Sequence, residues 1–382
     1  MTSLPKLSLY VHIPWCVQKC PYCDFNSHGL KHKEFQQSEY VDALLEDLDF
    51  DIKRFNINRP LHSIFIGGGT PSLFDGQHIA RLLQGIRQRI PLESDCEISL
   101  EANPGTAEAQ RFQAYFEAGV NRLSIGVQSF NAQHLQKLGR IHDPIQASAA
   151  VKMAKDVGFK RLNIDIMHGL MQQDTSQALD DLRQAIALDP SHISWYQLTI
   201  EANTAFASKP PTLPDDDMLW DIFEQGRAML SQAGYQQYEV SAFAKVDEQS
   251  RHNLNYWRFG DYLGIGCGAH GKISDVDLSV QRSEKIKHPK GYLAAGQDKT
   301  RQLKPVEQNE LVFEFFLNRL RLFESIPFTD FENFCSLDRS HAQQLLHNSI
   351  DQGLIELTSD AWLLTPRGQL FVNEILQVFV DQ

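Results

Sequence analysis

The sequence predicts an α/β protein: a partial (βα)6 barrel followed by a smaller α+β domain of winged-helix-like type. Three observations support this fold class. Six short apolar segments alternate with helical patterns, which is typical of a parallel sheet with helices packed outside it. Most of these segments are apolar on one face only. Residues 306–382 change to helices followed by a hairpin and one more helix, which is typical of a separate small unit.

The expected strands begin at regular intervals through the first half of the chain. They are Leu7–Ile13, His62–Ile66, Cys96–Ala102, Arg122–Val127, Arg161–Met167 and His192–Ile200. Helical stripes lie between them, and the first of these comprises Val41, Leu44, Leu45, Leu48 and Ile52. Six such units form either an open doubly wound sheet or an incomplete barrel.

Alternation within the strands favours the barrel. In the first strand residues 9, 11 and 13 are apolar, whereas residues 8, 10 and 12 are polar. A parallel sheet covered by helices on both faces is almost wholly apolar, and a closed eight-stranded barrel is filled by branched side chains. We therefore expect an open barrel around a polar ligand, with Tyr10, Glu101, Gln128 and Asp165 on its inner face.

Three cysteines follow the first strand at the spacing C-x3-C-x2-C: Cys16, Cys20 and Cys23. Cubane iron–sulfur clusters are normally held by four cysteines, one for each iron. Three thiolates therefore leave one iron open for a small ligand. Zinc stays open as an alternative, with His12 or His28 as the fourth ligand.

Other polar loops are expected on the same rim, because ligands of parallel α/β folds lie at the carboxyl ends of the strands. Gly67 to Gly69 follow the second strand and allow a ligand to approach the backbone, although a tight turn would also need them. Glu101 suits an ammonium group or ribose hydroxyls, and its alternative is a structural ion pair. Arg140 fits a helix surface equally well.

Together these motifs resemble the radical S-adenosylmethionine (SAM) superfamily. The resemblance narrows to the branch of oxygen-independent coproporphyrinogen III oxidases and HemW-type haem chaperones. It rests on Tyr-Val-His-Ile-Pro-Trp-Cys, Ile-Gly-Gly-Gly-Thr-Pro-Ser-Leu, Gly-Val-Gln-Ser-Phe and Asn-Ile-Asp-Ile-Met-His-Gly-Leu, and it spans nearly the whole chain.

The resemblance implies a set of cofactor contacts. The three cysteines would bind a [4Fe–4S] cluster, whose fourth iron SAM chelates through its amino and carboxylate groups. Tyr10, Gly68 and Glu101 correspond to contacts with this SAM. The contacts of a second SAM in the oxidase correspond to Gly69, Thr70, Gln128, Arg140 and Asp165.

Two features separate the members of this branch. The oxidases carry a fourth cysteine two residues after the third, where this chain has Phe25. The segment from His252 to Trp257 matches the H-N-x-x-Y-W motif of the haem-binding members. Imidazole is a common axial ligand of haem iron, so the resemblance implies a haem contact at His252. Without the resemblance the segment is an ordinary aromatic-rich loop.

We therefore expect a haem chaperone that binds haem and passes it to an acceptor protein, with no catalytic residue assigned. The cluster and SAM would serve structure, dimerisation or release, so a homodimer is among the expectations. The alternative is a radical SAM decarboxylase of coproporphyrinogen III. The expected units are a barrel over residues 1–240, a connecting region with the H-N-x-x-Y-W motif over 241–305, and the C-terminal domain over 306–382.

Composition narrows the remaining classes. The chain has 382 residues, 42% of them hydrophobic, with a net charge of −12 and a pI near 5.6. The acidic balance disfavours nucleic-acid partners, and with them a tRNA-modifying enzyme. No stretch reaches the roughly 18 apolar residues of a membrane span. The other three cysteines are scattered and nothing resembles a signal peptide, so we expect a cytoplasmic protein with reduced thiols.

Overall fold

A computed structural model describes residues 4–30, 35–105, 109–276 and 279–379. Its main sheet has twelve strands in the order β14-β13-β12-β11-β1-β4-β5-β6-β7-β8-β10-β9. Six consecutive strands of this sheet, all parallel, are the predicted ones: β1 (Leu7–Ile13), β4 (Leu61–Gly68), β5 (Leu92–Ala102), β6 (Arg122–Gln128), β7 (Arg161–His168) and β8 (His192–Gln197). The predicted partial barrel is confirmed.

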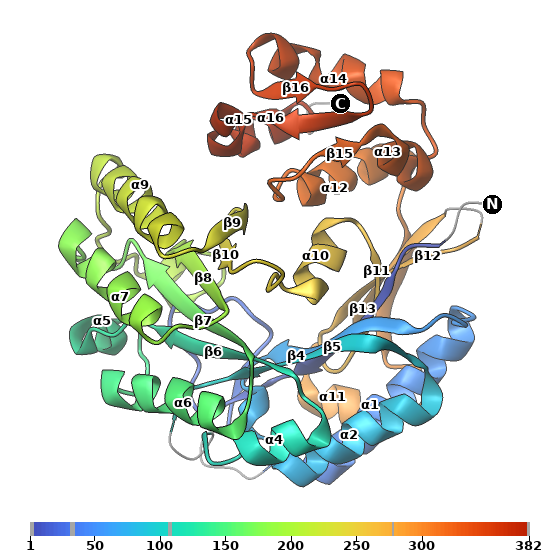
Figure 1. Ribbon diagram of the computed structural model, residues 1–382. Helices are drawn as coiled ribbons and strands as arrows, with labels where there is room; N and C mark the ends of the chain where they lie inside the picture. The colour runs from blue at the N-terminus through green and yellow to red at the C-terminus, as the bar shows by residue number, and fades with distance from the viewer. Residues whose placement is uncertain (1–3, 31–34, 106–108, 277–278, 380–382) are drawn as a thin grey trace.

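Helices cover the outer face of the parallel strands, as Figure 1 shows for α1, α2, α4 and α6. The helices up to residue 232 are α1 (Gln37–Arg54), η1 (Pro71–Leu73), α2 (Gly76–Arg89), α4 (Phe112–Ala118), α5 (Ala132–Lys137), α6 (Pro144–Val157), α7 (Thr175–Ala187), α8 (Ala205–Ser208) and α9 (Asp216–Gln232). Local sequence explains where several begin. Asp143 and Asp174 each accept a hydrogen bond from the third residue of α6 and α7, and a glutamine completes both capping boxes.

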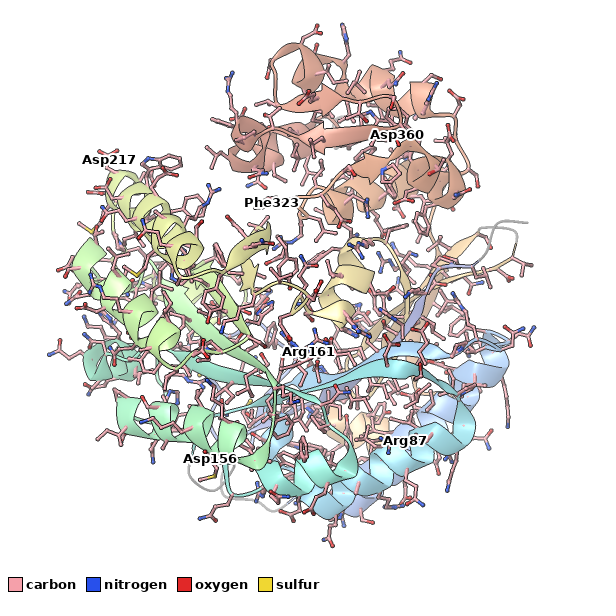
Figure 2. All side chains as sticks on the ribbon, in the orientation of Figure 1. Arg87, Asp156, Arg161, Asp217, Phe323 and Asp360 are labelled. Atoms are coloured by element: carbon pink, nitrogen blue, oxygen red, sulfur yellow. The ribbon has the colours of Figure 1, made fainter. Side chains whose placement is uncertain are left out.

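The two faces of the sheet differ as the alternation predicted. Leu9, Val11 and Ile13 are fully buried in the core that β1 shares with the outer helices. The polar residues of the other parity face inward. Figure 2 shows the side chain of Arg161, at the start of β7, near the centre of the molecule, while Arg87 and Asp156 lie in the outer helices.

The sheet extends beyond the predicted barrel on both sides. Strands β9 (Gln236–Glu239) and β10 (Ala242–Ala244) continue it past β8, and β11 (Asp261–Ile265) runs parallel to β1. Strands β12 (His270–Ser274), β13 (Val280–Lys285) and β14 (Thr300–Pro305) follow, with α11 (Pro289–Ala294) between the last two.

Strands β10 to β14 lie within residues 241–305, where the sequence predicts a connecting region and no strand. The glycines of these strands are there because the strands approach closely. A Cβ at Gly264 would lie 1.8 Å from the carbonyl oxygen of His270 on the neighbouring strand. Strand β14 is polar because it lies exposed at the edge of the sheet. Because of the glycines and the exposed polar residues, these strands lack the alternation of apolar and polar residues from which the other strands are predicted.

A short helix, α10 (Arg251–Trp257), lies on the inner side of the sheet against β1, β4 and β11 (Figure 1). It also contacts the first helix of the C-terminal part. No helix among the described residues is long and apolar enough to cross a membrane.

The C-terminal part has its own core and a three-stranded sheet ordered β15-β17-β16. Its elements are α12 (Gln308–Arg319), β15 (Ile326–Pro327), α13 (Phe328–Cys335), α14 (Arg339–Asp351), β16 (Ile355–Leu357), β17 (Ala361–Leu364), α15 (Pro366–Leu370) and α16 (Val372–Gln377). The expected helices, hairpin and final helix are present. Phe323 marks the place where this part meets the barrel in Figure 2, and its backbone N–H donates to Tyr238 of β9.

Candidate functional site

A cavity of about 400 Å³ opens at the carboxyl ends of the parallel strands. It is lined by most of the predicted site residues: Cys16, Cys20, Cys23, Gly68, Gly69, Thr70, Glu101, Gln128, Arg140 and Asp165. The fold therefore gathers residues from the cysteine loop, four strands and the segment after α5 around one space. Tyr10 and His252 are the two predicted residues that do not line it.

The three cysteines sit on a loop held between two short strands, β2 (Trp15–Cys16) and β3 (His28–Gly29). All three are free thiols in this structure. Burial raises the pKa of the Cys16 and Cys23 thiols above the usual value for cysteine. A metal bound here would have to displace these protons, because thiolates are the ligating form. The described residues contain no group of three His, Cys, Asp or Glu side chains placed to hold a single metal ion. The three cysteines do line one cavity, and three thiolates fit the larger iron–sulfur cluster, in which each binds a different iron and one iron is left open.

The two histidines considered as zinc ligands are engaged elsewhere. His12 hydrogen-bonds through Nε2 to the carbonyl oxygen of Asn26 at 2.9 Å and through Nδ1 to the Tyr10 hydroxyl at 3.0 Å. His28 contacts the carbonyl oxygen of Lys287 through Nε2 at 3.3 Å. These contacts argue against the zinc alternative.

The glycine loop packs directly on the cysteine loop. Gly68 has a φ of +112°, and a Cβ there would lie 2.6 Å from the His12 ring. A Cβ at Gly69 would lie 2.6 Å from the carbonyl oxygen of Trp15. The N–H of Gly69 donates to the carbonyl oxygen of Ile13 at the end of β1, and the N–H of Thr70 donates to that of Trp15, both at 2.7 Å. The glycines therefore serve a tight turn and also form a wall of the cavity.

Glu101 presents a carboxyl group to the cavity. Its Oε2 accepts from the backbone N–H of Gly68 at 3.0 Å. Burial, with a smaller contribution from the nearby Asp165, raises its pKa to about 8. Burial likewise raises the pKa of Asp165. Hydrogen bonds and the charge of Arg122 offset part of the burial of Asp165, whereas no positive charge acts on Glu101 among the described residues. This favours a cation or hydroxyl groups as the partner of Glu101.

The remaining predicted contacts are held by neighbours. Gln128 adopts a φ of +69° where the register of β6 against β7 shifts, and its Oε1 accepts from the Tyr196 hydroxyl at 2.8 Å. A non-glycine residue in this conformation costs free energy, and such strain clusters at functional sites. Asp165 accepts from Ser124 at 3.2 Å and from Asn163 at 2.7 Å.

Arg140 points into the cavity and not to the surface. Its guanidinium donates to Asn103 Oδ1 at 2.7 Å and to the carbonyl oxygen of Gly126 at 2.8 Å. It also reaches Cys20 Sγ at 3.7 Å. The helix-surface alternative for Arg140 is therefore wrong.

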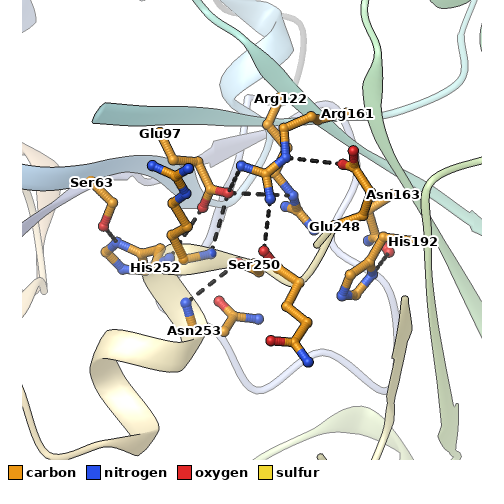
Figure 3. A network of polar contacts seen from close by, with 12 residues as sticks. Ser63, Glu97, Arg122, Arg161, Asn163, His192, Glu248, Ser250, His252 and Asn253 are labelled. Atoms are coloured by element: carbon orange, nitrogen blue, oxygen red, sulfur yellow. Dashed lines mark hydrogen bonds and ion pairs between the residues drawn. The ribbon is translucent and has the colours of Figure 1, made fainter. Parts of the chain in front are cut away.

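His252 lies in a separate polar network, on the inner face at the other end of the strands (Figure 3). Its Nδ1 contacts the Ser63 hydroxyl at 3.0 Å, and its ring centroid is 5.0 Å from that of Phe65. The residue is 8% exposed, and burial lowers its pKa to about 4. The imidazole is therefore neutral at physiological pH.

Glu97 ties this network to α10. Its carboxylate accepts from the backbone N–H groups of Arg251 and His252 at 3.2 and 3.1 Å. It pairs with Arg161 at 2.8 Å and lies 4.0 Å from Arg122 (Figure 3). The two arginines hold the pKa of the Glu97 carboxyl below its usual value, although burial acts in the opposite direction.

Comparison with known proteins assigns the chain to a family. A sequence model of the Radical SAM superfamily matches residues 10–182, and one of the HemN C-terminal domain matches residues 306–371. "Heme chaperone HemW" of Haemophilus influenzae is 54% identical over 100% of both chains. The protein of the same name from Escherichia coli is 53% identical, also over 100% of both. The chain belongs to the HemW family.

A solved structure agrees with the fold of this HemW-family chain. Coproporphyrinogen III oxidase (HemN) from Escherichia coli, described as a radical SAM enzyme, superposes with a TM-score of 0.83 at 24% identity. The match covers 98% of this chain and 90% of that one. At this identity the likeness concerns the fold alone.

Phe25 occupies the cavity mouth of the HemW-family chain at the position where the resemblance places a fourth oxidase cysteine. Its side chain is 56% exposed and lines the cavity. A phenyl ring supplies no sulfur ligand. It offers a flat apolar surface instead.

Sequence reasoning missed Asn103 and Tyr196 as site residues. Asn103 follows a strand on the ligand rim, which is a usable signal, but its bonds to Thr70 and Arg140 depend on three separate loops. Tyr196 has the inward parity of β8, and its bond to Gln128 of β6 passes over the intervening strand β7. Their positions could have been proposed from alternation, whereas their partners could not.

Proposed function

We propose that this protein is a haem chaperone, which binds haem and passes it to an acceptor protein. The observation that carries the proposal is the identity of 53–54% to proteins named "Heme chaperone HemW" over their whole length. Phe25 supports it, because the decarboxylase alternative expects a cysteine there. The acceptor's identity is not part of the proposal.

Cys16, Cys20 and Cys23 would hold a [4Fe–4S] cluster, and SAM would lie in the cavity against Gly68 and Glu101. A contact between SAM and Tyr10, which does not line the cavity, stays a prediction. The raised pKa of Glu101 supports a binding role, because an unpaired buried acid gains most from a cationic or hydroxylated ligand. When bound to an open iron, SAM supplies a source of one-electron chemistry. A second SAM among Gly69, Thr70, Gln128, Arg140 and Asp165 stays a prediction.

Haem would contact His252 on α10. The neutral imidazole is in the form that ligates iron, but it is buried against Ser63 and Phe65. Haem ligation at this residue therefore requires α10 to shift. We expect His252→Ala to weaken haem binding about tenfold or more, measured by the haem absorption spectrum during titration.

Ser63→Ala is the matched control for His252. It removes the hydroxyl that holds the imidazole but keeps the imidazole itself. We expect haem binding to be kept or strengthened in Ser63→Ala. Equal weakening in both variants would mean that the network, and not the imidazole, matters for haem. Unchanged binding in His252→Ala would contradict the assignment.

One experiment separates the chaperone from the decarboxylase. The protein is reconstituted anaerobically with iron and sulfide, then given haem in one sample and coproporphyrinogen III, SAM and a reductant in another. Near-stoichiometric haem uptake without protoporphyrinogen supports the chaperone. Formation of protoporphyrinogen would establish the enzyme and overturn the argument from Phe25.

We also propose a cytoplasmic location, which the six free thiols support. The homodimer stays a prediction. Light scattering of the protein before and after cluster reconstitution tests it, and a constant monomer mass in both states would reject it.

A further inference from the structure

A continuous polar chain connects two of the three cluster cysteines. Arg140 Nη1 donates to Cys20 Sγ at 3.7 Å, and its Nη2 donates to Asn103 Oδ1 at 2.7 Å. Asn103 Nδ2 donates to Thr70 Oγ1 at 3.1 Å, and the Thr70 side chain lies beside the Cys16 thiol. One arginine, one amide and one hydroxyl thereby lie between Cys20 and Cys16 along the wall of the cavity.

The guanidinium of Arg140 is fixed in this position. Its two hydrogen bonds, to Asn103 and to the carbonyl oxygen of Gly126 at 2.8 Å, hold it there. Its Nε atom is buried and has no hydrogen-bond partner among the described residues. The resemblance assigns Thr70 and Arg140 to a second SAM. In this structure both side chains are already bound to Asn103 and directed at cysteine sulfur.

Reduction of an iron–sulfur cluster adds negative charge that spreads onto the cysteine sulfurs. Hydrogen bonds to those sulfurs and a nearby positive charge stabilise the reduced state and raise the reduction potential. Of the side chains in this chain of contacts, Arg140 supplies both effects. Asn103 keeps the guanidinium in place and orients the Thr70 hydroxyl.

We propose that Arg140, supported by Asn103 and Thr70, sets the reduction potential of the cluster held by the three cysteines. These are positioning residues that act through the cluster ligands. The inference rests on the proposed cluster and is independent of haem binding at α10.

The test is a redox titration of the reconstituted protein without SAM, followed by electron paramagnetic resonance. Omitting SAM separates this role from any contact with SAM. At the wild-type midpoint, we expect Arg140→Met to lower the ratio of reduced to oxidised cluster at least tenfold, which is about 59 mV for a one-electron couple. Arg140→Lys keeps the positive charge but loses the planar guanidinium, so its midpoint potential should lie between those of the wild type and Arg140→Met.

Two further variants distinguish the contact of Arg140 with the cysteine sulfur from the effect of any positive charge near the cavity. Asn103→Ala keeps the guanidinium but removes its partner, and we expect a smaller downward shift. Arg111→Met removes a cation from the same rim. Arg111 binds the Ser72 carbonyl oxygen and Asp75, and it is not among the residues that line the cavity, so the midpoint should be unchanged.

Iron and sulfide content distinguishes the failure of this inference from the failure of the cluster. A wild-type protein that takes up neither would overturn the proposed cluster itself. Equal midpoints in wild type and Arg140→Met, both fully loaded, would overturn the inference alone. If Arg140→Met does not assemble a cluster, Asn103→Ala decides, and an unchanged midpoint there rejects the proposal.

Discussion

Glu101 makes the stability of the ligand-free protein depend on pH. Its pKa is about 8 in the folded protein, against about 4.5 for the unfolded side chain. Between these values the folded state keeps a proton that the unfolded state has lost, so this residue's contribution to stability falls as pH rises. The slope is at most about 1.4 kcal/mol per pH unit. We expect Glu101→Gln to show a flatter stability profile than wild type between pH 5 and 8.

Denaturant unfolding at each half unit of pH measures this difference. Asp165 also has a raised pKa and remains in both proteins, so only the difference between the two profiles reports on Glu101. Parallel profiles would show that Glu101 is not the group that holds the proton.

Gly68 is the glycine of the cavity wall that tolerates a side chain least. Its positive φ and the 2.6 Å approach of the His12 ring make Gly68→Ala strained in both backbone and contacts. We expect a loss of roughly 1–3 kcal/mol in stability and reduced iron uptake. Gly29→Ala is the matched control, because a Cβ there meets nothing within 4 Å. Equal iron content and melting temperature in both variants would reject this reasoning.

At the scale of residues, the sequence predicted most of the groups that line the cavity, with Tyr10 as an exception, but it did not predict their partners. The cysteine motif and the glycine motif are each one continuous segment that follows a strand. Because the two strands are parallel neighbours, both motifs lie on the same rim. The sequence left Arg140 ambiguous because its contacts come from Asn103, after β5, and from the backbone of Gly126 within β6. His252 was assigned from a motif, and its burial under Glu97 depends on the path of α10 across the sheet.

At the scale of elements, the buried carboxylate of Glu97 binds the start of α10 to the sheet. Removing Glu97 takes the ion-pair partner from Arg122 and one of two from Arg161, which keeps Glu248 at 3.1 Å. It also leaves two N–H groups of α10 without their acceptor. Breaking a buried pair in this way costs about 3–5 kcal/mol. We therefore expect Glu97→Ala to lower the free energy of unfolding by that amount at neutral pH.

Asp95 provides the control on the same strand. It pairs with Arg251 of α10, but its side chain is exposed, so water screens the pair. We expect Asp95→Ala to unfold at nearly the wild-type denaturant concentration. Because the pKa of Glu97 is lowered, its stabilisation disappears as pH falls below its usual range, and the gap between wild type and Glu97→Ala should narrow there. A constant gap would contradict the ion-pair explanation.

The elements that the sequence predicted share a clear signal. Strands β1 and β4–β8 are apolar on the helix-covered face, so alternation identified each of them. Strands β11–β14 carry no such signal. Gly264 and Gly271 occupy two of them because neighbouring atoms leave no room for a Cβ, and β14 is largely exposed. This segment joins the sheet because β11 pairs with β1, and no local sequence pattern predicts that pairing.

At the scale of the whole molecule, α10 joins the barrel to the C-terminal part. His252 and Asn255 face the sheet, where Asn255 Nδ2 donates to Ser8 at 2.9 Å. Leu254 and Trp257 pack instead against a small cluster that includes Leu322 from the C-terminal side. A shift of α10 that frees His252 for haem would therefore disturb the junction between the two parts.

Trp257 tests this coupling. Its ring packs on the cluster at the junction and lies 4.5 Å below the guanidinium of Arg321, while its Nε1 has no hydrogen-bond partner among the described residues. Trp257→Ala removes the packing, and we expect a loss of roughly 2–4 kcal/mol together with faster hydrogen exchange at Val240 and Phe323. Both N–H groups bond across the junction, to Arg321 and Tyr238.

Trp257→Phe keeps an aromatic ring, although it is smaller than indole, and removes the unpaired N–H, so it should stay within about 1.5 kcal/mol of wild type with near-normal exchange. If α10 must move for haem to bind, haem should in turn speed exchange at Val240 and Phe323 in the wild-type protein. Unchanged exchange on haem binding would mean that haem binds without disturbing the junction. It would then have to reach a ligand other than the buried His252.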